Sequence, residues 1–465
     1  MINLFWELME EVLKPIKSIS VKALISILFF WIVCCLFACK ETEKPFSENQ
    51  VAVSWGEMTL YIMQYTPANS PTYASRSIGY IGLTAYESVV NSNEEYLSMA
   101  GQLNGLDALP IPEPNKEYNW LASYNAAQAE ILRGIYMQTS DVNKAKIDSL
   151  EQVVELNLLE NKIDKEILER SASYGKSIAQ AIFEWSKTDG GHRAYLHNFD
   201  KELAHPEFPG SWKPPLYAQS FSHHPLHPYW GENRTFVKKN ALLATPSIIA
   251  YNPEKNSDYY NQFLAVYEQD KKLTQEDKEV ALWWGDDPDD SFTPPGHSYY
   301  IATAAIKHYN AGLLQAGQTY AQVGMSVADA FINCWKWKYH FFSERPNTFI
   351  PEFIDQEWES FWPDPPFPSF PSGHAIQAAA MATAMENLYD PFHFTDSSHV
   401  HRERDHVREV DFKARSFDNF WDVAEETARS RFFGGIHTPQ DNKVGLEEGK
   451  RIAGNVIKLK WKIDA

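Results

Sequence analysis

The sequence predicts an all-α protein. Stretches with the apolar spacing of helices follow one another along most of the 465-residue chain, strand-type alternation is scarce, and no nucleotide-type glycine loop occurs. This length suits one large domain or two fused helical bundles. Aromatic residues make up 14% of the chain, so large rings must fill much of its interior.

The charge balance restricts the ligands. The formal net charge is -19, and no long basic run offsets it. An acidic surface repels nucleic acid, so we expect no nucleic-acid partner. Any anion site must therefore be a local concentration of cations.

The first part of the chain, residues 1–38, is predicted to be an export signal. Three lysines precede an apolar run that ends in Ala38, immediately before Cys39. The end of this run resembles a bacterial lipobox, which implies that Cys39 is lipidated after cleavage. We expect a protein anchored by lipid to a bacterial membrane, facing the periplasm or the cell surface, with residues 39–50 as a polar tether. The alternative is an uncleaved membrane anchor.

The expected helices fall into two groups separated by a long ordered loop over residues 188–233, which is rich in Gly, Pro, His and aromatic residues. We assign residues 51–230 to an N-terminal helical bundle with this loop, and residues 231–465 to a C-terminal bundle. Polar residues 393–411 are expected to form a solvated surface insertion. The predicted helices cover residues 51–65, 74–93, 117–138, 143–157, 164–187, 256–270, 274–285, 297–315, 321–343, 373–388, 417–433 and 440–460.

The first chemical motif is a pair of cations in an aromatic helix. Lys338 and Arg345 lie seven residues apart, which is nearly two helical turns, so we expect them to share a face. Pro346 is predicted to end this helix. Two like charges on one face repel each other unless an anion lies between them. The alternative is a solvated basic stripe.

The second motif is Pro-Ser-Gly-His at a helix start. Ser372 is placed to cap the helix that follows. The first N–H groups of a helix bind anions, and Gly373 permits their close approach. His374 then projects from the first turn beside the anion. The alternative is a histidine that is simply packed or exposed.

The third motif, residues 430–441, supplies Arg431 and a second histidine. Two glycines stop one helix, and Thr438 caps the next, so His437 lies at a helix start. Asp441 lies one turn further on, where its carboxylate can hold the tautomer of the imidazole. The alternative is an ordinary corner between two helices. Elsewhere, the acidic run 286–290 is expected to form a turn in which one carboxylate pairs with a pocket arginine.

The combined pattern K-x6-RP, PSGH and SR-x5-H-x3-D resembles that of the vanadium-dependent haloperoxidase and type 2 phosphatidic acid phosphatase superfamily. The segments SPTYASRSIGYIGLTAYESVVN, GSWKPPLY, HPYWG and DDSFTPPGHSYY resemble the haloperoxidase branch. The resemblance covers about residues 70–460. It implies two packed four-helix bundles with the site at one end of the second bundle.

The resemblance implies a vanadium-dependent haloperoxidase that uses hydrogen peroxide and a halide. In that family pattern, His437 bonds vanadium, His374 accepts a proton from the peroxide, and Lys338 polarises it. Trp335 and Phe367 match positions that line the halide side of the cofactor in that family. Two aromatic rings there would form an apolar wall, which favours iodide or bromide. The vanadate oxygens are held by Lys338, Arg345, Arg431, Ser372 and the Gly373 N–H.

Two alternatives remain open at this stage. Phosphate has the shape and charge of vanadate, so the same residues fit an acid phosphatase in which His437 attacks a phosphomonoester and His374 protonates the leaving oxygen. The Thr-Pro-Gln that follows His437 departs from the usual haloperoxidase pattern and is also seen in the phosphatase branch. A third reading is a surface lipoprotein that binds glycans without catalysis.

Overall fold

The computed structural model describes residues 44–214, 224–288 and 290–463. The predicted export signal, Cys39 and residues 39–43 of the tether lie outside these residues. Within the described ranges, no helix is long and apolar enough to cross a membrane.

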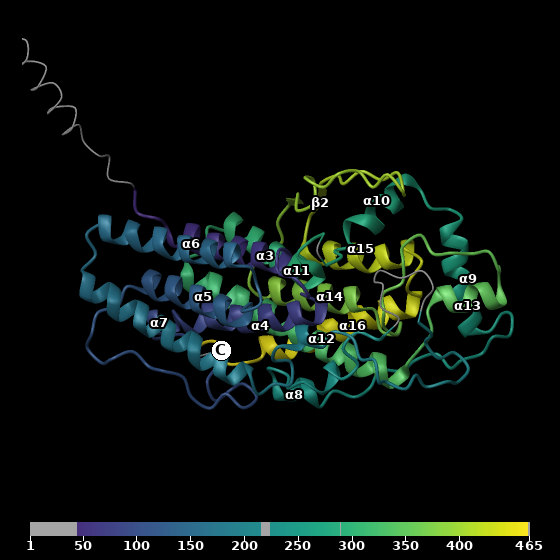
Figure 1. Cartoon of the computed structure of the whole chain (residues 1–465), viewed down its shortest axis with the longest axis horizontal. Coiled ribbons are helices and arrows are strands. Elements are labelled where there is room, and N and C mark those ends of the chain that lie inside the picture. The colour runs from purple at the N-terminus through teal and green to yellow at the C-terminus, as the bar shows by residue number, and fades with distance from the viewer. Residues whose placement is uncertain (1–43, 215–223, 289, 464–465) are drawn as a thin grey trace, which may run out of the picture.

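The described chain is built from helices, with two short strands as the only regular sheet found in it, and so the all-α prediction is confirmed (Figure 1). The strands β1 (Phe394–Asp396) and β2 (Arg415–Phe417) pair antiparallel. Short 3₁₀ turns are η2 (Val90–Ser92), η3 (Ala194–Leu196) and η4 (Trp230–Glu232). The helices are α3 (Glu48–Gln64), α4 (Pro71–Glu87), α5 (Trp120–Ile135), α6 (Asp141–Glu160), α7 (Lys165–Ser186), α8 (Lys238–Ala241), α9 (Asp258–Asp270), α10 (Gln275–Trp283), α11 (Thr293–His308), α12 (Leu313–Phe341), α13 (Pro346–Phe353), α14 (Gly373–Glu386), α15 (Phe420–Phe433) and α16 (Pro439–Ile457).

Side-chain caps fix where most of these helices begin. A Ser, Thr, Asn or Asp side chain at the N-cap accepts a hydrogen bond from a first-turn N–H, which would otherwise lack a partner. Three of the caps are capping boxes, in which the third helical residue bonds back to the cap: Ser47 with Gln50, Thr274 with Asp277, and Thr438 with Asp441.

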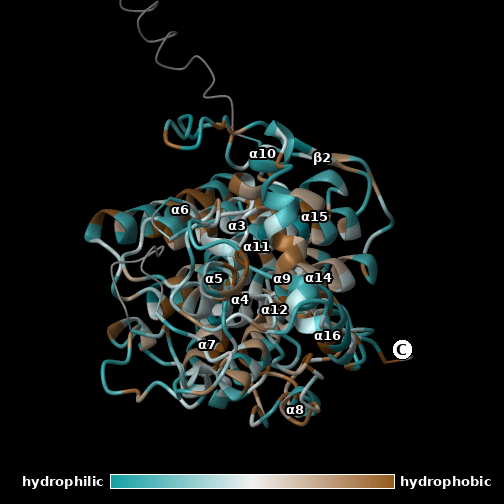
Figure 2. Ribbon diagram, turned by 90° about the vertical axis from the view of Figure 1, so that its right-hand side faces the viewer, coloured by the Kyte–Doolittle hydropathy of each residue, from teal (hydrophilic) through white to brown (hydrophobic). Residues whose placement is uncertain are grey.

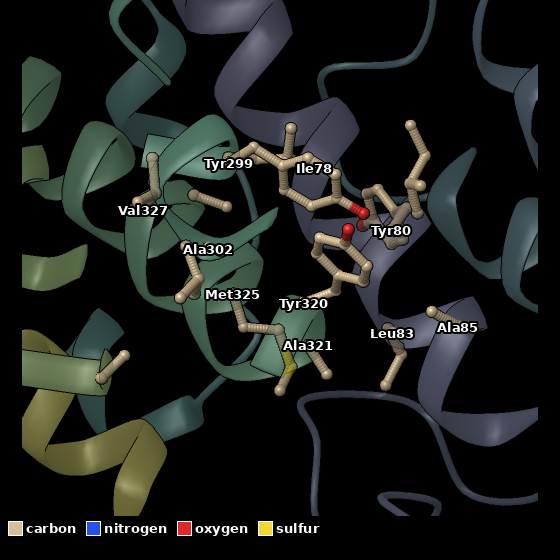
Figure 3. Close-up of a cluster of buried hydrophobic side chains, with 14 of the residues drawn as sticks. Ile78, Tyr80, Leu83, Ala85, Tyr299, Ala302, Tyr320, Ala321, Met325 and Val327 are labelled. Atoms are coloured by element: carbon tan, nitrogen blue, oxygen red, sulfur yellow. The ribbon is translucent and has the colours of Figure 1, made fainter. Parts of the chain in front are cut away.

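Helices α4 and α12 form the centre of the molecule. Figure 2, viewed along the long axis, shows them near the middle, with α6, α7, α15 and α16 around them. Gly82 and Gly324 allow the two backbones to approach closely, since a Cβ on Gly82 would lie 2.1 Å from the Tyr320 carbonyl oxygen. Tyr320 in turn stacks on Tyr299 of α11 at 4.4 Å, in the cluster drawn in Figure 3.

One apolar cluster contains residues from both predicted bundles. The boundary assigned at residue 230 therefore stays a prediction. Figure 1 places α5, α6 and α7 at one end of the molecule and α9 and α13 at the other.

Some expected boundaries were wrong. Residues 48–50 belong to α3 and not to the tether, because Ser47 caps that helix. Helix α12 ends at Phe341, before Arg345, with Phe342 in a left-handed conformation at φ 47°. Pro346 does not end this helix but begins α13, where its fixed φ suits the first helical position.

Four helix ends define the region that holds the sequence motifs. The C-terminal part of α12 supplies Lys338, and the C-terminal turn of α15 supplies Arg431. Ser372 caps α14, and His437 immediately precedes the cap of α16. These four helices pack against one another, which brings the residues of the three sequence motifs together.

Candidate anion-binding active site

The three predicted cations are buried: Lys338, Arg345 and Arg431 each expose 1% or less of their surface. Removing a charged group from water is costly unless it is paired and hydrogen-bonded. The structure therefore brings together three side chains whose charges need compensation, and the solvated basic stripe considered from the sequence is excluded.

Lys338 is held by the loop that precedes α14. Its Nζ donates to the Pro368 and Ser369 carbonyl oxygens at 2.9 and 2.6 Å. Burial lowers the pKa of Lys338 to about 7, and the neighbouring charge of Arg345 adds to that effect. An anion in the pocket would favour the protonated form and raise this pKa again.

Arg345 is held by the same loop and by the turn that precedes α16. Its Nε donates to the Phe367 carbonyl at 2.9 Å, and its Nη1 donates to the Ile436 carbonyl at 2.8 Å. Burial lowers its pKa, as for the lysine. The carbonyl oxygens thus fix the guanidinium directly beside His437, the residue that follows Ile436.

Arg431 is hydrogen-bonded through two of its three guanidinium nitrogens. Its Nη2 donates to the Ala281 carbonyl at 2.6 Å, and its Nε donates to Ser430 Oγ at 2.9 Å. Its Nη1 is buried and has no hydrogen-bond partner among the described residues. Burial lowers the pKa of Arg431 to about 10, although the charges of Asp287 and Asp286 oppose that shift.

His437 is oriented by a carboxylate, as the sequence predicted. Its Nδ1 lies 3.0 Å from Asp441 Oδ2, which also accepts a hydrogen bond from Ser369 Oγ at 2.6 Å. Burial lowers the pKa of His437 to about 3, so the ring is neutral near pH 7. A neutral ring that donates from Nδ1 to Asp441 carries its lone pair on Nε2, the atom available to bond a ligand.

The Pro-Ser-Gly-His motif begins α14 as expected. Ser372 Oγ accepts from the Ala375 N–H at 3.4 Å, and the Ser372 N–H donates to the Asp441 carbonyl, which joins the starts of α14 and α16. His374 Nε2 is buried, and no hydrogen-bond partner for it lies within the described part of the chain. Burial, together with Arg431, holds the pKa of His374 well below its usual range. This imidazole is therefore neutral and able to accept a proton.

Aromatic rings form one wall beside the cations. Trp335 and Phe367 contact each other at 4.9 Å between ring centroids. Lys338 Nζ lies 5.2 Å from the Phe367 centroid, and the Arg345 guanidinium lies 5.3 Å from it. Both rings line a partly enclosed cavity of about 310 Å³ that is also lined by Gly373, His374 and His437.

A buried network that the sequence did not reveal lies behind this pocket. His297 Nδ1 bonds to Asp286 Oδ2 at 2.8 Å, and its Nε2 bonds to Asp396 Oδ2 at 2.7 Å. His399 Nε2 bonds to the second oxygen of Asp286 at 2.8 Å. The prediction that residues 393–411 are a solvated insertion was wrong for His399, which is 1% exposed, because Asp286 anchors it in the interior.

This network carries a net negative charge toward the pocket. Burial would lower the pKa of His297, but the two flanking carboxylates raise it to about 10. Burial would likewise raise the pKa of Asp286, but His297 and His399 hold it well below its usual range. One imidazolium between two carboxylates leaves one negative charge, which faces Arg431. Among the described residues, no carboxylate of the acidic run forms an ion pair with Arg431, so the pairing expected from the sequence stays a prediction; Asp290 pairs instead with Arg402 at 3.2 Å.

The network could have been found only in part from the sequence. His297 lies in the segment DDSFTPPGHSYY, which was singled out as haloperoxidase-like. Asp396 and His399 carry no motif and lie about a hundred residues further along the chain. Ser369, which bonds Asp441, was also missed; its position three residues before Ser372 was the available signal.

The donor set fits a tetrahedral oxyanion. Three buried cations lie near the N-terminus of α14, and among the described residues Arg431 Nη1 and His374 Nε2 are buried without a hydrogen-bond partner. An oxyanion accepts hydrogen bonds on every oxygen and would compensate the buried charges. The residues present therefore fit vanadate, and phosphate by the same chemistry.

Comparisons with known proteins find relatives of the same fold. A family model described as the VCPO second helical-bundle domain matches residues 318–463. A crystal structure of a bacterial vanadium-dependent iodoperoxidase is 28% identical, with a TM-score of 0.73, and the match covers 89% of this chain and 97% of that one. No curated protein matches the chain.

Two bacterial vanadium-dependent chloroperoxidase structures share the fold. The apo form is 15% identical, with a TM-score of 0.64, over 84% of this chain and 93% of that one. The holo form is 16% identical, with a TM-score of 0.61, over 90% and 94%. The sequence match over residues 318–463 and the structural matches support a relation to the haloperoxidase branch of the vanadium-dependent haloperoxidase and type 2 phosphatidic acid phosphatase superfamily.

Proposed function

We propose that the protein is a vanadate-dependent peroxidase that oxidises iodide or bromide with hydrogen peroxide at His437. The observation that carries this proposal is the set of three buried cations around a histidine whose Nδ1 is already held by Asp441. Vanadate, when bound, would supply Lewis-acid activation of the peroxide. The same donors would hold phosphate in its place.

Each residue of the pocket would have a different role in binding or catalysis. Lys338, Arg345 and Arg431 would neutralise the oxyanion, and Ser372 and the Gly373 N–H would bond to it at the start of α14. His437 would offer Nε2. His374 is neutral and lines the same cavity, so it would accept the proton that hydrogen peroxide loses. General-base help of this kind typically contributes about 10²–10⁴-fold in rate.

The preference for iodide or bromide follows from the aromatic wall of the cavity. Trp335 and Phe367 give the cavity an aromatic side next to Lys338. An apolar wall excludes water and suits an ion that is weakly hydrated, whereas a phosphate ester needs polar partners. The similarity to an iodoperoxidase of 28% identity supports the same choice.

Steady-state kinetics on vanadate-free and vanadate-loaded protein test this proposal. We expect peroxide-dependent oxidation of iodide and bromide only after loading, and hydrolysis of a generic phosphomonoester only in the vanadate-free state. Efficient phosphomonoester turnover without halide oxidation in the loaded protein would assign the chain to the phosphatase chemistry. A protein inert in both assays would favour the glycan-binding alternative.

We also propose that the protein is exported and anchored by lipid at Cys39. The support is the sequence alone, in which an apolar run ends in Ala38 before that cysteine. Mass spectrometry of the native protein should find a chain that begins at a modified Cys39. An N-terminus at Met1, or an unmodified Cys39 in a cleaved chain, contradicts this.

A further inference from the structure

Two buried histidines, His297 and His399, have no task in the proposed reaction. Both bond to Asp286 at 2.8 Å, through Nδ1 of His297 and through Nε2 of His399. The second nitrogen of His297 bonds to Asp396 at 2.7 Å. Burying charged groups is costly even when they are paired, so such a network is weak evidence for stability alone. A role in placing the carboxylate that both histidines share is the alternative.

Asp286 has a backbone conformation that its surroundings must hold. Its φ is 50°, in the left-handed region that few residues other than glycine adopt. Such a conformation persists where the neighbouring structure fixes it. The carboxylate accepts from both histidines and also from Ser291 Oγ at 3.1 Å. Because the φ of Asp286 sets the plane of the peptide group before it, these bonds also fix the direction of the Gly285 carbonyl.

The Gly285 carbonyl acts on His374. The two residues line the same cavity, together with Asp286. Burial holds the pKa of His374 well below its usual range, and Arg431 adds to that effect, whereas hydrogen bonding with the Gly285 carbonyl opposes it. An acceptor has this effect because it favours the ring that carries a proton. Catalytic hydrogen bonds are often long or poorly aligned before the ligands bind, and they tighten afterwards.

The two nitrogens of His374 have different surroundings. Nε2 is buried and has no other partner in the described part of the chain, although the residue as a whole is half-buried. The accessible edge of the ring is therefore the one with Nδ1. A neutral ring that keeps its proton on Nε2, against the Gly285 carbonyl, carries its lone pair on Nδ1. That nitrogen is then able to accept a proton from the cavity.

We propose that His297 and His399 are positioning residues that clamp Asp286. The clamp holds the Gly285 carbonyl against Nε2 of His374 and so makes Nδ1 the proton acceptor. The inference rests on the proposed function, in which hydrogen peroxide loses a proton to His374. The O–H bond breaks with its electron pair on oxygen, and the proton goes to Nδ1. Neither clamping histidine lines the cavity, so both act through Asp286.

Amide side chains can replace one ring nitrogen at a time. The amide nitrogen of Asn takes the place of Nδ1, and that of Gln takes the place of Nε2. His297 reaches Asp286 through Nδ1, so His297→Asn keeps this bond and His297→Gln loses it. His399 reaches Asp286 through Nε2, so the order is reversed: His399→Gln keeps the bond and His399→Asn loses it.

NMR of vanadate-free protein with isotope-labelled histidine reads the tautomer of His374 without any turnover. The resonances missing from His374→Ala identify this ring. We expect the proton on Nε2 in the unmodified protein and in the two variants that keep the Asp286 bond. The two variants that lose the bond should show a mixture of tautomers. The same tautomer in all four variants, or changes that do not reverse between the two positions, would overturn the proposal.

Kinetics of the vanadate-loaded variants give a second readout. The variants that lose the bond should lower kcat by about 10–100-fold, the range found when an outer hydrogen-bond partner of a metal-site histidine is lost. Vanadate affinity should stay unchanged. Weaker vanadate binding with unchanged kcat would overturn the proposal, because the network would then act on Arg431, whose pKa the charge of Asp286 raises against burial. If no form of the protein oxidises halide, the proposed function fails, and the tautomer still decides the positioning role.

Glu87→Gln controls for the loss of a buried ionisable group. Glu87 is 1% exposed, lies in α4 and does not line the cavity. This variant should leave the tautomer of His374 and kcat unchanged. A change as large as that of the bond-losing variants would assign their effect to general packing and contradict the clamp. Each histidine position gives its own order of Asn and Gln, so one position is decisive where variants of the other fail to fold.

Discussion

Asp441 performs two tasks from one position. Its carboxylate completes the capping box of α16 with Thr438, and the same oxygen holds His437 Nδ1 at 3.0 Å. Helix initiation and the orientation of the imidazole are therefore joined in one side chain. Asp277 has only the first task among the described contacts: it is half-buried and completes the capping box of α10 with Thr274.

These two aspartates allow the tasks to be separated. Asp441→Ala should weaken vanadate binding by roughly 10–100-fold, the usual cost of losing a partner that orients a metal-bound histidine. Asp277→Ala should leave vanadate affinity within 2-fold, although both variants lose the bond from the third helical residue back to the cap. Equilibrium dialysis followed by metal analysis measures both. Equal affinities in the two variants would show that the cap alone matters.

The two histidines are expected to differ in role. His437→Ala should abolish both vanadate retention and turnover, because it removes the only atom expected to bond the metal. His374→Ala should retain vanadate and lower kcat by about 10²–10⁴-fold, because this ring acts on a proton. Bound vanadium and kcat are measured on the same samples. Metal loss in His374→Ala with retention in His437→Ala would mean that the roles are reversed.

At the scale of elements, local sequence signals predicted the contacts between residues that lie close together in the chain. The caps at Ser372 and Thr438 were predictable because an N-cap side chain bonds within three residues of itself. The end of α12 was not predictable, because the residue in the left-handed conformation is Phe342 and not the glycine that usually marks such a helix end. The network of Asp286, His297 and His399 was missed for a different reason: its members are joined only by packing of distant segments.

The contact between α4 and α12 gives a prediction for the fold. A Cβ on Gly82 would lie 2.1 Å from the Tyr320 carbonyl oxygen, which is backbone and cannot turn aside. Gly82→Ala should therefore destabilise the protein by about 1–3 kcal/mol or more, as overpacking does. Gly454→Ala is the matched control, since it lies inside α16 with nothing within 4 Å of the new carbon. That change should stabilise the protein by up to about 1 kcal/mol. Chemical denaturation measures both, and a Gly82→Ala variant as stable as Gly454→Ala contradicts the close packing.

At the scale of the whole molecule, burial of carboxyl groups makes stability depend on pH. Glu87 lies in α4, is 1% exposed, and accepts hydrogen bonds from the Met99 N–H and the Ser98 hydroxyl. Burial raises its pKa from 4.5 to about 7, despite these two hydrogen bonds. Between these two values the folded state holds a proton that the unfolded state has released. Its contribution to stability is therefore fully present below pH 4.5 and is lost as the pH rises to about 7.

Glu87→Gln tests this sign without touching the site. The amide oxygen can accept from Met99 and the amide nitrogen can donate to Ser98, while the titration is removed. The free energy of unfolding of the variant, relative to the unmodified protein, should rise between pH 5 and pH 7.5 by at most about 3 kcal/mol. Urea denaturation at a series of pH values measures it. A difference that stays constant over this range would show that Glu87 does not titrate as described.

The carbonyl oxygens that hold Lys338 and Arg345 affect which anion of the medium occupies the pocket. Because the Pro368, Ser369 and Ile436 carbonyls hold these cations in place by themselves, the pocket does not have to assemble around its guest. It is then a preformed binding site for any tetrahedral oxyanion, and phosphate differs little from vanadate in shape or charge. Occupancy would follow the ratio of the two anions in the medium. Phosphate in a growth medium or a purification buffer would compete with the metal, and an enzyme starved of phosphate would be the more readily loaded.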